Sequence, residues 1–321
     1  MIKIGSQKID TNIFLSPLAG CADLAFRLIA REYGAKFCFF EMADANALTH
    51  GPGKNKEILM IHPDDTPIAA QLLGGDPQIM LEAAQILLGQ IKPAFLDINA
   101  ACPAKKVLKK RAGAYLVDEP DLLAAIIGKL TSSLPLPITV KLRSGFKQND
   151  HGHIISVARK CEESGAAAIF IHGRTQRQLY AGEVDYEAIR LVKENVSIPI
   201  FGSGNILSVQ LAKKMFDETG CDGILVARGA IGHPWIFREI EEYLKTGKIP
   251  EPIDLPRRIK VLERHLSYIE KIRQSRPSNK IGLMRRIALE YLKGLPNSTA
   301  IRRLIAPAKS YEQLVARCLS L

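Results

Sequence analysis

The sequence lacks the features that mark membrane proteins, metal-binding modules and disulfide-rich proteins. No run of apolar residues approaches the 18 or so that a membrane-spanning helix needs, so we expect no membrane association. The six cysteines are scattered without any C-x-x-C pair, which indicates neither a zinc knuckle nor a disulfide framework. No cluster of His, Cys, Asp and Glu has the spacing of metal ligands, so we expect no metal.

The amino terminus, residues 1–5, lacks the charged and apolar segments of a secretory signal, and we therefore expect a cytoplasmic protein. With 47% hydrophobic and 24% charged residues, the chain of 321 residues can bury a sizeable core. This length fits an α/β barrel of about 250 residues followed by a small second domain. No exposed apolar stripe stands out, so we expect a monomer.

Positive charge is concentrated near the carboxyl terminus. Residues 236–321 contain 18 Lys and Arg against 9 Asp and Glu, whereas residues 1–235 contain 26 against 24. A nearly neutral body joined to a basic tail predicts a polyanionic partner, with nucleic acid favoured over a membrane surface. The alternative is a basic surface that is merely solvated.

Short β-branched or aromatic runs alternate with amphipathic helical stretches through the first 235 residues. The runs cover residues 12–17, 37–41, 68–73, 95–100, 138–143, 168–172, 198–202 and 223–227. The helical stretches cover residues 23–34, 77–90, 119–133, 153–165, 186–195 and 208–219. Eight such units predict an α/β fold, a (β/α)8 TIM barrel, with a doubly wound sheet as the alternative. Residues 44–66 resemble a long loop.

Strand patterns disappear after residue 239, and helical spacing continues through residues 259–273 and 281–292. Pro250 and Pro252 interrupt any helix between the two regions. We therefore predict a barrel over residues 1–245 and a smaller C-terminal all-helical domain over residues 246–321.

Polar residues stand at the carboxyl ends of the predicted strands, where barrel enzymes carry their sites. They are Glu41, Gln71, Asn99, Lys141, Arg143, His172, the Gly202–Asn205 turn and Arg228 with Gly229. So many polar groups at one end predict a binding site. The glycine-rich turn and the guanidinium after the last strand favour a phosphorylated ligand, although the glycines could serve only as turn residues.

The residue types at these ends favour redox chemistry on an organic cofactor. Lys141 and His172 could stabilise negative charge on a bound ring, and Gln71 suits an imide or amide edge. No catalytic carboxylate pair, Ser-His-Asp arrangement or metal cluster appears there, which disfavours hydrolysis. We interpret His151-Gly152-His153 as a polar loop rather than a metal site.

Cys102 differs from the other cysteines because it follows Asn99 at a strand end, precedes Pro103 and is trailed by several lysines. This context predicts an exposed loop thiol. A protonated thiol could act as a general acid, whereas surrounding cations would favour a nucleophilic thiolate. The residues alone leave both roles open.

Eight motifs in order along the chain resemble those of one enzyme family. They are SPLAG from Ser16, FFEM from Phe39, QLLG from Gln71, DINAACPAKKVLKKRAGAYL from Asp97, VKLRSG from Val140, IHGRTQRQLYAGEVDY from Ile171, GSGNI from Gly202 and ARGAIGHPWIF from Ala227. By its resemblance in these motifs, the chain is identified as a member of the flavin-dependent tRNA-dihydrouridine synthases, in particular of the B-type bacterial branch.

The resemblance implies an FMN-containing barrel with a helical RNA-binding domain. NADPH reduces FMN in that family, the flavin passes a hydride to C6 of a uracil in tRNA, and a cysteine, here Cys102, protonates C5. By position, the residues implied to bind FMN are Pro17, Leu18, Ala19, Gln71, Lys141, His172, Ser203, Gly204, Asn205, Ala227 and Arg228. Asn99 and Arg143 are implied to touch the substrate base. Leu18, Ser203, Asn205 and Ala227 depart from the usual family residues, and the last three bear on FMN affinity rather than on the reaction.

Two arginine pairs on the helical pattern are our candidates for contacts to the RNA backbone: Arg285 with Arg286, and Arg302 with Arg303. The alternative is that they form solvated helix faces.

Three other functions remain open from the sequence. A dihydrouridine synthase could act on rRNA, and a small-molecule FMN dehydrogenase of the dihydroorotate type would share the cofactor site. A non-catalytic RNA-binding protein could retain the barrel. The basic tail argues against the small-molecule enzyme, and intact Cys102, Lys141 and His172 argue against a non-catalytic protein.

Overall fold

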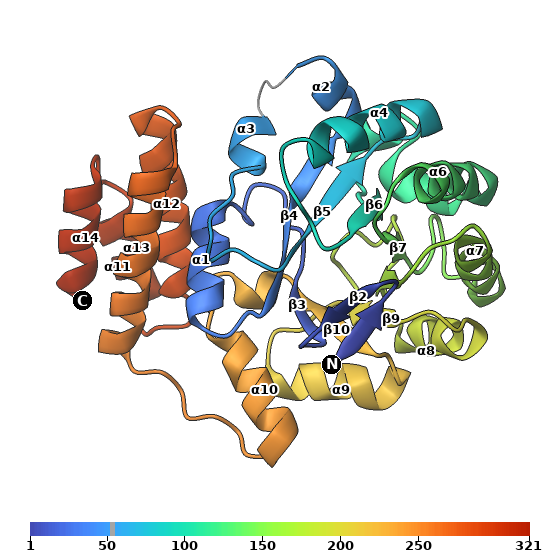
Figure 1. Cartoon of the computed structure of the whole chain (residues 1–321). Helices are drawn as coiled ribbons and strands as arrows, with labels where there is room; N and C mark the ends of the chain where they lie inside the picture. Colours follow the sequence, from blue (N-terminus) through green and yellow to red (C-terminus); the bar gives the residue numbers. More distant parts are fainter. Residues whose placement is uncertain (52–54) are drawn as a thin grey trace.

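The computed structural model describes residues 1–51 and 55–321, and eight parallel strands of the chain close into a barrel (Figure 1). The strands are β3 (Ile13–Leu15), β4 (Phe37–Asp44), β5 (Ile68–Leu73), β6 (Leu96–Ala100), β7 (Ile138–Arg143), β8 (Ile169–His172), β9 (Ile200–Ser203) and β10 (Gly223–Val226). They pair in chain order, and β10 returns to pair with β3. This closure confirms the predicted TIM barrel and excludes the doubly wound sheet.

Aromatic side chains fill the interior near the amino ends of the strands. This cluster contains Phe14, Phe37, Phe39, Phe95, Phe170 and Phe201. The antiparallel hairpin of β1 (Ile2–Ile4) and β2 (Gln7–Ile9) adds Ile4 and Ile9 to the same cluster. Because this end of the barrel is packed with apolar side chains, only the opposite end has room for a ligand.

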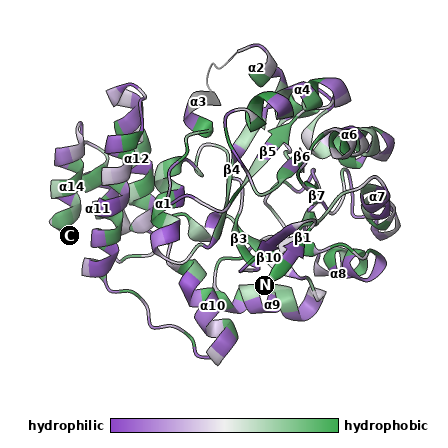
Figure 2. Ribbon diagram, in the orientation of Figure 1, coloured by the Kyte–Doolittle hydropathy of each residue, from purple (hydrophilic) through white to green (hydrophobic). Residues whose placement is uncertain are grey.

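The helices around the barrel begin at recognisable caps. They are α1 (Leu24–Glu32), α4 (Pro77–Leu88), α6 (Pro120–Ser133), α7 (His151–Glu163), α8 (Tyr186–Asn195), α9 (Val209–Thr219) and α10 (Ile236–Thr246). Asp23, Asp76, Asp150, Asp185 and Ser208 each accept a backbone N–H in the first turn of the helix that follows. Hydrophilic and hydrophobic residues alternate along these helices, while the strands are mostly hydrophobic (Figure 2). Such helices cover a buried sheet.

Two local predictions were wrong. In the segment 44–66, predicted as a loop, the structure has the short helices α2 (Ala45–Thr49) and α3 (Asn55–Ile58), and Asp44 caps α2 through the N–H of Ala47. His151 and His153 lie in the first turn of α7 rather than in a loop, because the capping signal of Asp150 starts the helix there. Residues 52–54 lie outside the described part of the chain.

Short elements complete the loops at the carboxyl ends of the strands. They are α5 (Lys105–Leu108), the 3-10 helix η1 (Gly113–Val117) and the 3-10 helix η2 (Arg228–Ala230). Within the described residues, no helix has both the length and the apolar character needed to cross a bilayer.

Four further helices follow an extended stretch after α10 and lie to one side of the barrel (Figure 1). They are α11 (Leu255–Ile272), α12 (Pro277–Tyr291), α13 (Ser298–Ile305) and α14 (Tyr311–Leu319). Their contact with the barrel centres on α1, where His265 and Tyr291 are buried beside Phe26. This helical region agrees with the predicted fold class. The boundary at residues 245 and 246 falls at the end of α10 and remains a prediction about separate domains.

A buried ionic network fixes α1 and the turn before it. Asp65 accepts hydrogen bonds from Arg27 Nε at 2.7 Å and Arg31 Nε at 2.8 Å, and Arg27 Nη1 donates to the carbonyl of Ala22 at 2.7 Å. Arg27 and Asp65 are almost wholly excluded from solvent. Since α1 is also the docking surface of the helical region, this network supports both parts of the molecule.

We expect Asp65→Ala to lower the free energy of unfolding by about 3–5 kcal/mol, because it leaves two guanidinium groups without their buried partner. Asp217→Ala is the matched control, since Asp217 pairs with Lys213 on the exposed surface of α9 and should leave stability nearly unchanged. Urea unfolding of both variants measures the difference. Equal, small effects would contradict a structural role for the network.

Candidate active site

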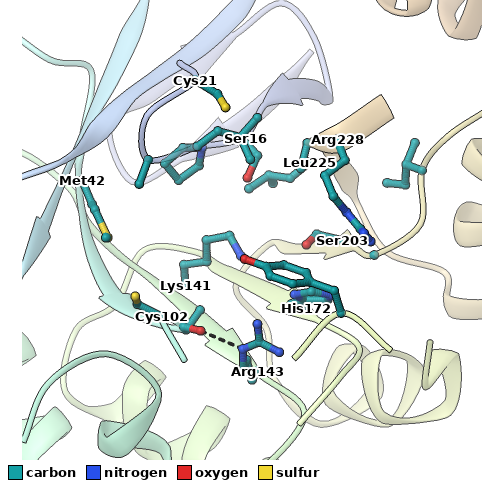
Figure 3. Close-up of a pocket in the computed structure, with 18 of the residues that line it drawn as sticks. Ser16, Cys21, Met42, Cys102, Lys141, Arg143, His172, Ser203, Leu225 and Arg228 are labelled. Atoms are coloured by element: carbon teal, nitrogen blue, oxygen red, sulfur yellow. Dashed lines mark hydrogen bonds between the residues drawn. The ribbon is translucent and has the colours of Figure 1, made fainter. Parts of the chain in front are cut away.

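A cavity of about 380 Å³ opens at the carboxyl ends of the barrel strands (Figure 3). Glu41, also at a strand end, does not line the cavity, whereas the fourteen barrel residues predicted to act in catalysis or to bind FMN or the base all do: Pro17, Leu18, Ala19, Gln71, Asn99, Cys102, Lys141, Arg143, His172, Ser203, Gly204, Asn205, Ala227 and Arg228. The strand order explains this convergence, because every strand contributes its last inward-facing residues to one rim. Their individual roles remain predictions.

Neighbouring strands bring the central polar groups side by side. The register pairs Asn99 with Lys141, Arg143 with His172, and His172 with Ser203. Asn99 and Asp97 lie two residues apart on β6, so both point to the barrel interior. The same period of two places polar side chains in layers above the phenylalanine cluster.

A directed chain of buried hydrogen bonds leads from the barrel interior to the Cys102 loop. Asp97 accepts from Thr139 Oγ1 and from Gln71 Nε2, each at 2.7 Å. Gln71 Oε1 accepts from Asn99 Nδ2 at 2.8 Å, and Asn99 Oδ1 accepts the backbone N–H of Cys102 at 2.8 Å. When it is ionised, the Asp97 carboxylate can only accept, and it then sets the direction in which both amides face.

Burial changes the protonation of three groups in this layer. It raises the pKa of Asp97 to about 7, although the bonds from Gln71 and Thr139 and the charge of Lys141 lower it. Burial and the nearby Arg143 lower the pKa of Lys141 to about 8. Burial and the charge of Lys141 lower the pKa of His172 to about 2. At neutral pH the cavity therefore presents a lysine that is mostly cationic beside an uncharged imidazole.

Arg143 is buried and ties together the loops around the cavity. Its Nε donates to the carbonyl of Ala101 at 2.7 Å, the contact drawn in Figure 3, and its Nη1 donates to the carbonyls of Thr175 at 2.8 Å and Leu179 at 3.0 Å. Most of its hydrogen-bonding capacity is therefore used inside the protein. The guanidinium still lines the cavity, so the predicted contact with a base would fall to its remaining donors.

Tyr180 is a lining residue that the sequence analysis did not single out. Its side chain is 57% exposed, its ring centroid lies 5.0 Å from the Arg228 guanidinium carbon, and it lies 6.4 Å from the His172 ring centroid. The signal available in the sequence for Tyr180 was an aromatic residue in a strand-end loop, between Arg143 and Arg228, which also line the cavity. The ring offers a surface on which a planar group could stack.

Asp97 and Met42 were also missed. Asp97 stands inside an otherwise apolar strand, which was a usable sign of a buried polar role. Met42 lines the cavity, and its Sδ lies 3.4 Å from Asn99 Nδ2. Met42 ends the FFEM motif, which was the available signal in the sequence.

The loops after β9 and β10 form a turn suited to a phosphate. Gly204 and Asn205 both have positive φ, and Arg228 Nη2 donates to Asn205 Oδ1 at 3.3 Å while its side chain stays exposed. A Cβ on Gly229 would lie 2.0 Å from the carbonyl of Ile206, so only glycine allows the two loops to approach this closely. Backbone N–H groups and a guanidinium at such a turn bind anions.

The loop carrying Pro17, Leu18 and Ala19 is held from both sides at Gly20. Glu41 accepts the N–H of Gly20, and Arg286 Nη2 donates to its carbonyl at 2.8 Å. The helical region therefore braces one wall of the cavity. Burial raises the pKa of Glu41, and the bond from Gly20 opposes that rise.

The four arginines predicted to contact RNA do not line the cavity. Arg285 Nη1 donates to the carbonyl of Ala306 at 2.7 Å, and Arg286 holds Gly20, so both already bond to the protein backbone. Arg302 and Arg303 are exposed on α13. Contacts between these four residues and RNA remain a prediction.

No group of three or more His, Cys, Asp and Glu able to hold a metal ion occurs in the described residues. His151 contacts Asp185, and His153 contacts the carbonyl of Val117, so the two histidines face different partners.

Substituting Asp97 tests the direction of the buried chain. We expect Asp97→Leu to lower the free energy of unfolding by about 2–5 kcal/mol, because it orphans the donors of Gln71 and Thr139. Asp97→Asn should be tolerated far better, since its oxygen can accept from Gln71 while its amide donates to the Thr139 hydroxyl. Comparable losses of stability in both variants would contradict this arrangement of hydrogen bonds around Asp97.

The stability of the wild type and that of Asp97→Asn should depend differently on pH. The pKa of Asp97 is raised in the folded protein, so the folded state holds its proton more tightly than the unfolded state does. Wild-type stability should therefore fall, relative to Asp97→Asn, as the pH rises from about 4 to about 7. Urea unfolding at pH 5 and pH 8 measures this difference, and a difference of opposite sign would contradict the assignment.

Comparison with known proteins shows the family. The model of the dihydrouridine synthase (Dus) family matches residues 14–320. The tRNA-dihydrouridine synthase B of Pseudomonas aeruginosa is 37% identical over 269 residues, which cover 84% of this chain and 80% of that protein. The enzyme of the same name from Pasteurella multocida is 35% identical over 316 residues, 98% of this chain and 94% of that protein.

Solved structures share the barrel at much lower identity. An old yellow enzyme homologue from Zymomonas mobilis has a TM-score of 0.55 at 13% identity, covering 78% of this chain and 93% of that chain. The old yellow enzyme from Trypanosoma cruzi has a TM-score of 0.56 at 11% identity, with the same coverage. These likenesses show the fold alone. The match over almost the whole sequence, with relatives above 30% identity, shows that the chain belongs to the dihydrouridine synthase family.

Proposed function

We propose that this protein reduces specific uridines in tRNA to 5,6-dihydrouridine, with FMN as cofactor and NADPH as reductant. The observation that carries the proposal is the family match over residues 14–320, joined to a cavity in which the Cys102 loop faces Lys141 and His172. The relatives named above are tRNA-dihydrouridine synthases. A protein with this substrate would act in the cytoplasm, and we propose that it acts as a monomer.

The residues that line the cavity would suit the ring, the pyrimidine edge and the phosphate of FMN. Pro17, Leu18 and Ala19 supply an apolar wall for a planar ring. Gln71 has an amide N–H and an oxygen lone pair left after its bonds to Asp97 and Asn99, which suits the pyrimidine edge of the flavin. The residues that would hold the phosphate are Ser203, Gly204, Asn205, Ala227 and Arg228. Ser203 and Asn205 keep polar side chains at this turn.

Reduced FMN, when bound, supplies the hydride that is added to C6 of the uracil. Lys141 would stabilise negative charge on the ring, because its ammonium is buried and mostly protonated at neutral pH. His172 would remain uncharged and offer a hydrogen bond rather than a second positive charge. The two side chains therefore have different electrostatic roles despite lying on adjacent strands.

Cys102 would complete the reaction by donating its thiol proton to C5 of the uracil, so that the C5=C6 double bond gains one hydride and one proton. The thiolate left behind regains its proton from solvent. Asn99 holds the loop through the N–H of Cys102, and its amide N–H near Met42 makes only a weak contact that a uracil carbonyl could replace. The base must leave its stack to reach this depth.

Dihydrouridine should be lost from one or a few tRNA positions when the gene is deleted. The measurement is site-resolved mass spectrometry of total tRNA and rRNA from cells with and without the gene, in a strain without a redundant enzyme. Loss confined to rRNA would move the substrate while keeping the chemistry. No loss in either RNA would contradict the proposal and favour a small-molecule flavoenzyme.

Cys102→Ala should lower the rate of dihydrouridine formation by about 10²–10⁴-fold while RNA binding is largely kept, because only the proton donor is removed. Cys21→Ala is the matched control, since Cys21 is the other cysteine lining the cavity. Single-turnover reduction of tRNA by the reduced enzyme measures both variants. Unchanged turnover in Cys102→Ala would rule out the general-acid role.

A further inference from the structure

Positive charge exceeds negative charge in the three loops that follow β6, β7 and β8 at the carboxyl rim of the barrel. These loops, residues 101–119, 144–150 and 173–185, contain eight Lys and Arg against five Asp and Glu, and Asp150 and Asp185 each cap the helix that follows. The remainder of residues 1–235 contains 18 Lys and Arg against 19 Asp and Glu. The small positive surplus of residues 1–235 is therefore located at this rim.

Most of these cations are free of protein partners. Lys110 pairs with Asp44 at 2.9 Å, and Arg174 is buried and donates to the carbonyl of Gly182 at 2.6 Å. The other six are exposed and form no salt bridge within residues 1–51 and 55–321. We name these six the rim cations: Lys105, Lys106, Lys109, Arg111, Lys147 and Arg177.

Contacts between the three loops place the rim cations on one continuous surface. Gln176 Nε2 donates to the carbonyl of Pro103 at 3.3 Å, and the N–H of Arg177 donates to the carbonyl of Phe146 at 3.2 Å. The rings of Tyr115 and Phe146 meet edge to face with centroids 6.4 Å apart, and the Arg111 guanidinium carbon lies 5.7 Å from the Tyr115 centroid. Loops far apart in the sequence thus form a single patch.

This patch is attached rigidly to Cys102. The N–H of Ala114 donates to the carbonyl of Cys102 at 3.0 Å, which closes the loop at its base. Val107 on α5 is buried in a small apolar cluster with Leu73. Gly113 has a φ of 63°, and a Cβ there would lie 2.7 Å from the Cys102 carbonyl. The lysines of α5 therefore keep a fixed position relative to the thiol.

We infer that the rim cations form a second RNA-binding surface, which holds backbone phosphates beside the uridine that enters the cavity. This inference rests on the proposed function. Exposed cations that form no salt bridge attract a polyanion, and phosphates supply most of the affinity for nucleic acid. The nucleotides next to a uracil that reaches Cys102 must pass the cavity mouth, where the loops bearing the rim cations begin.

The helical region approaches the cavity from the α1 side, where Arg286 holds Gly20. The rim cations lie on the loops of β6, β7 and β8, on the other side of the same mouth. RNA held on both sides would be positioned about the cavity, so that the two surfaces together select which uridine enters. This division also explains why the nearly neutral total charge of residues 1–235 hides an anion-binding surface.

The triple variant Lys105→Ala, Lys106→Ala, Lys109→Ala tests this inference. We expect its Kd for an unmodified tRNA transcript to rise about tenfold or more at 0.1 M salt. We also expect a salt dependence shallower by about two in the slope of log K against log salt, because fewer counterions are released. Fluorescence anisotropy with labelled transcript measures both quantities. In turnover assays, KM for tRNA should rise by a similar factor while kcat changes less than about twofold.

The matched control removes three exposed lysines at the opposite end of the barrel: Lys3→Ala, Lys8→Ala, Lys92→Ala. These lysines lie in β1, in β2 and just before β6, and they form no salt bridge among the described residues. The Kd and the salt slope of this control triple should stay within about twofold of the wild-type values. Thermal unfolding and flavin content of both triples verify that each is folded.

Wild-type affinity and salt slope in the rim triple would overturn the inference. Equal weakening in both triples would also overturn it, because net charge rather than the rim would then govern binding. A wild-type protein that binds the transcript but forms no dihydrouridine would instead contradict the proposed function, so the two failures are distinguishable.

Discussion

Closure of the barrel is the constraint on which the site depends. Eight parallel strands that return to pair β10 with β3 have all their carboxyl ends at one rim, so residues as distant in sequence as Pro17 and Arg228, 211 positions apart, line one cavity. The opposite end is filled by phenylalanines and covered by the β1–β2 hairpin. A ligand therefore has one place to enter, and every loop that matters for recognition surrounds it.

Inside the barrel, hydrogen bonds between buried polar groups fix the orientation of side chains and loops, which apolar packing alone would not specify. Asp97 accepts from two partners and thereby directs Gln71 and Asn99, and Asn99 in turn fixes the backbone of Cys102. Arg143 similarly joins the Cys102 loop to the loop after β8. A side-chain donor or acceptor left unpaired at such depth costs free energy, so each bond specifies one arrangement over its alternatives.

The positions of the charged groups, more than their number, determine the electrostatics of the site. The cavity combines a cationic lysine with an imidazole that burial keeps neutral, while the uncompensated cations lie outside, on exposed loops where water solvates them. Burying several unpaired charges in the cavity would oppose folding, whereas the same charges at the rim remain available to a polyanion. The helical region contributes to the site differently, since Arg286 braces Gly20 and so positions the apolar wall.

The sequence by itself determined the fold class, the family and fourteen of the residues that line the cavity, because these depend on local periodicity and on motifs that can be read in order. Eight apolar runs, their polar ends and the Asn99-to-Cys102 motif required no knowledge of distant contacts. The helix start at His151 was also local, and the capping residue Asp150 was overlooked. Only the tertiary structure decided the partners of Asp97, the backbone contacts of Arg143 and Arg285, and which cations of the barrel are free of acids. Those outcomes depend on side chains from different strands and loops, and a linear pattern cannot say which of them meet after the barrel closes.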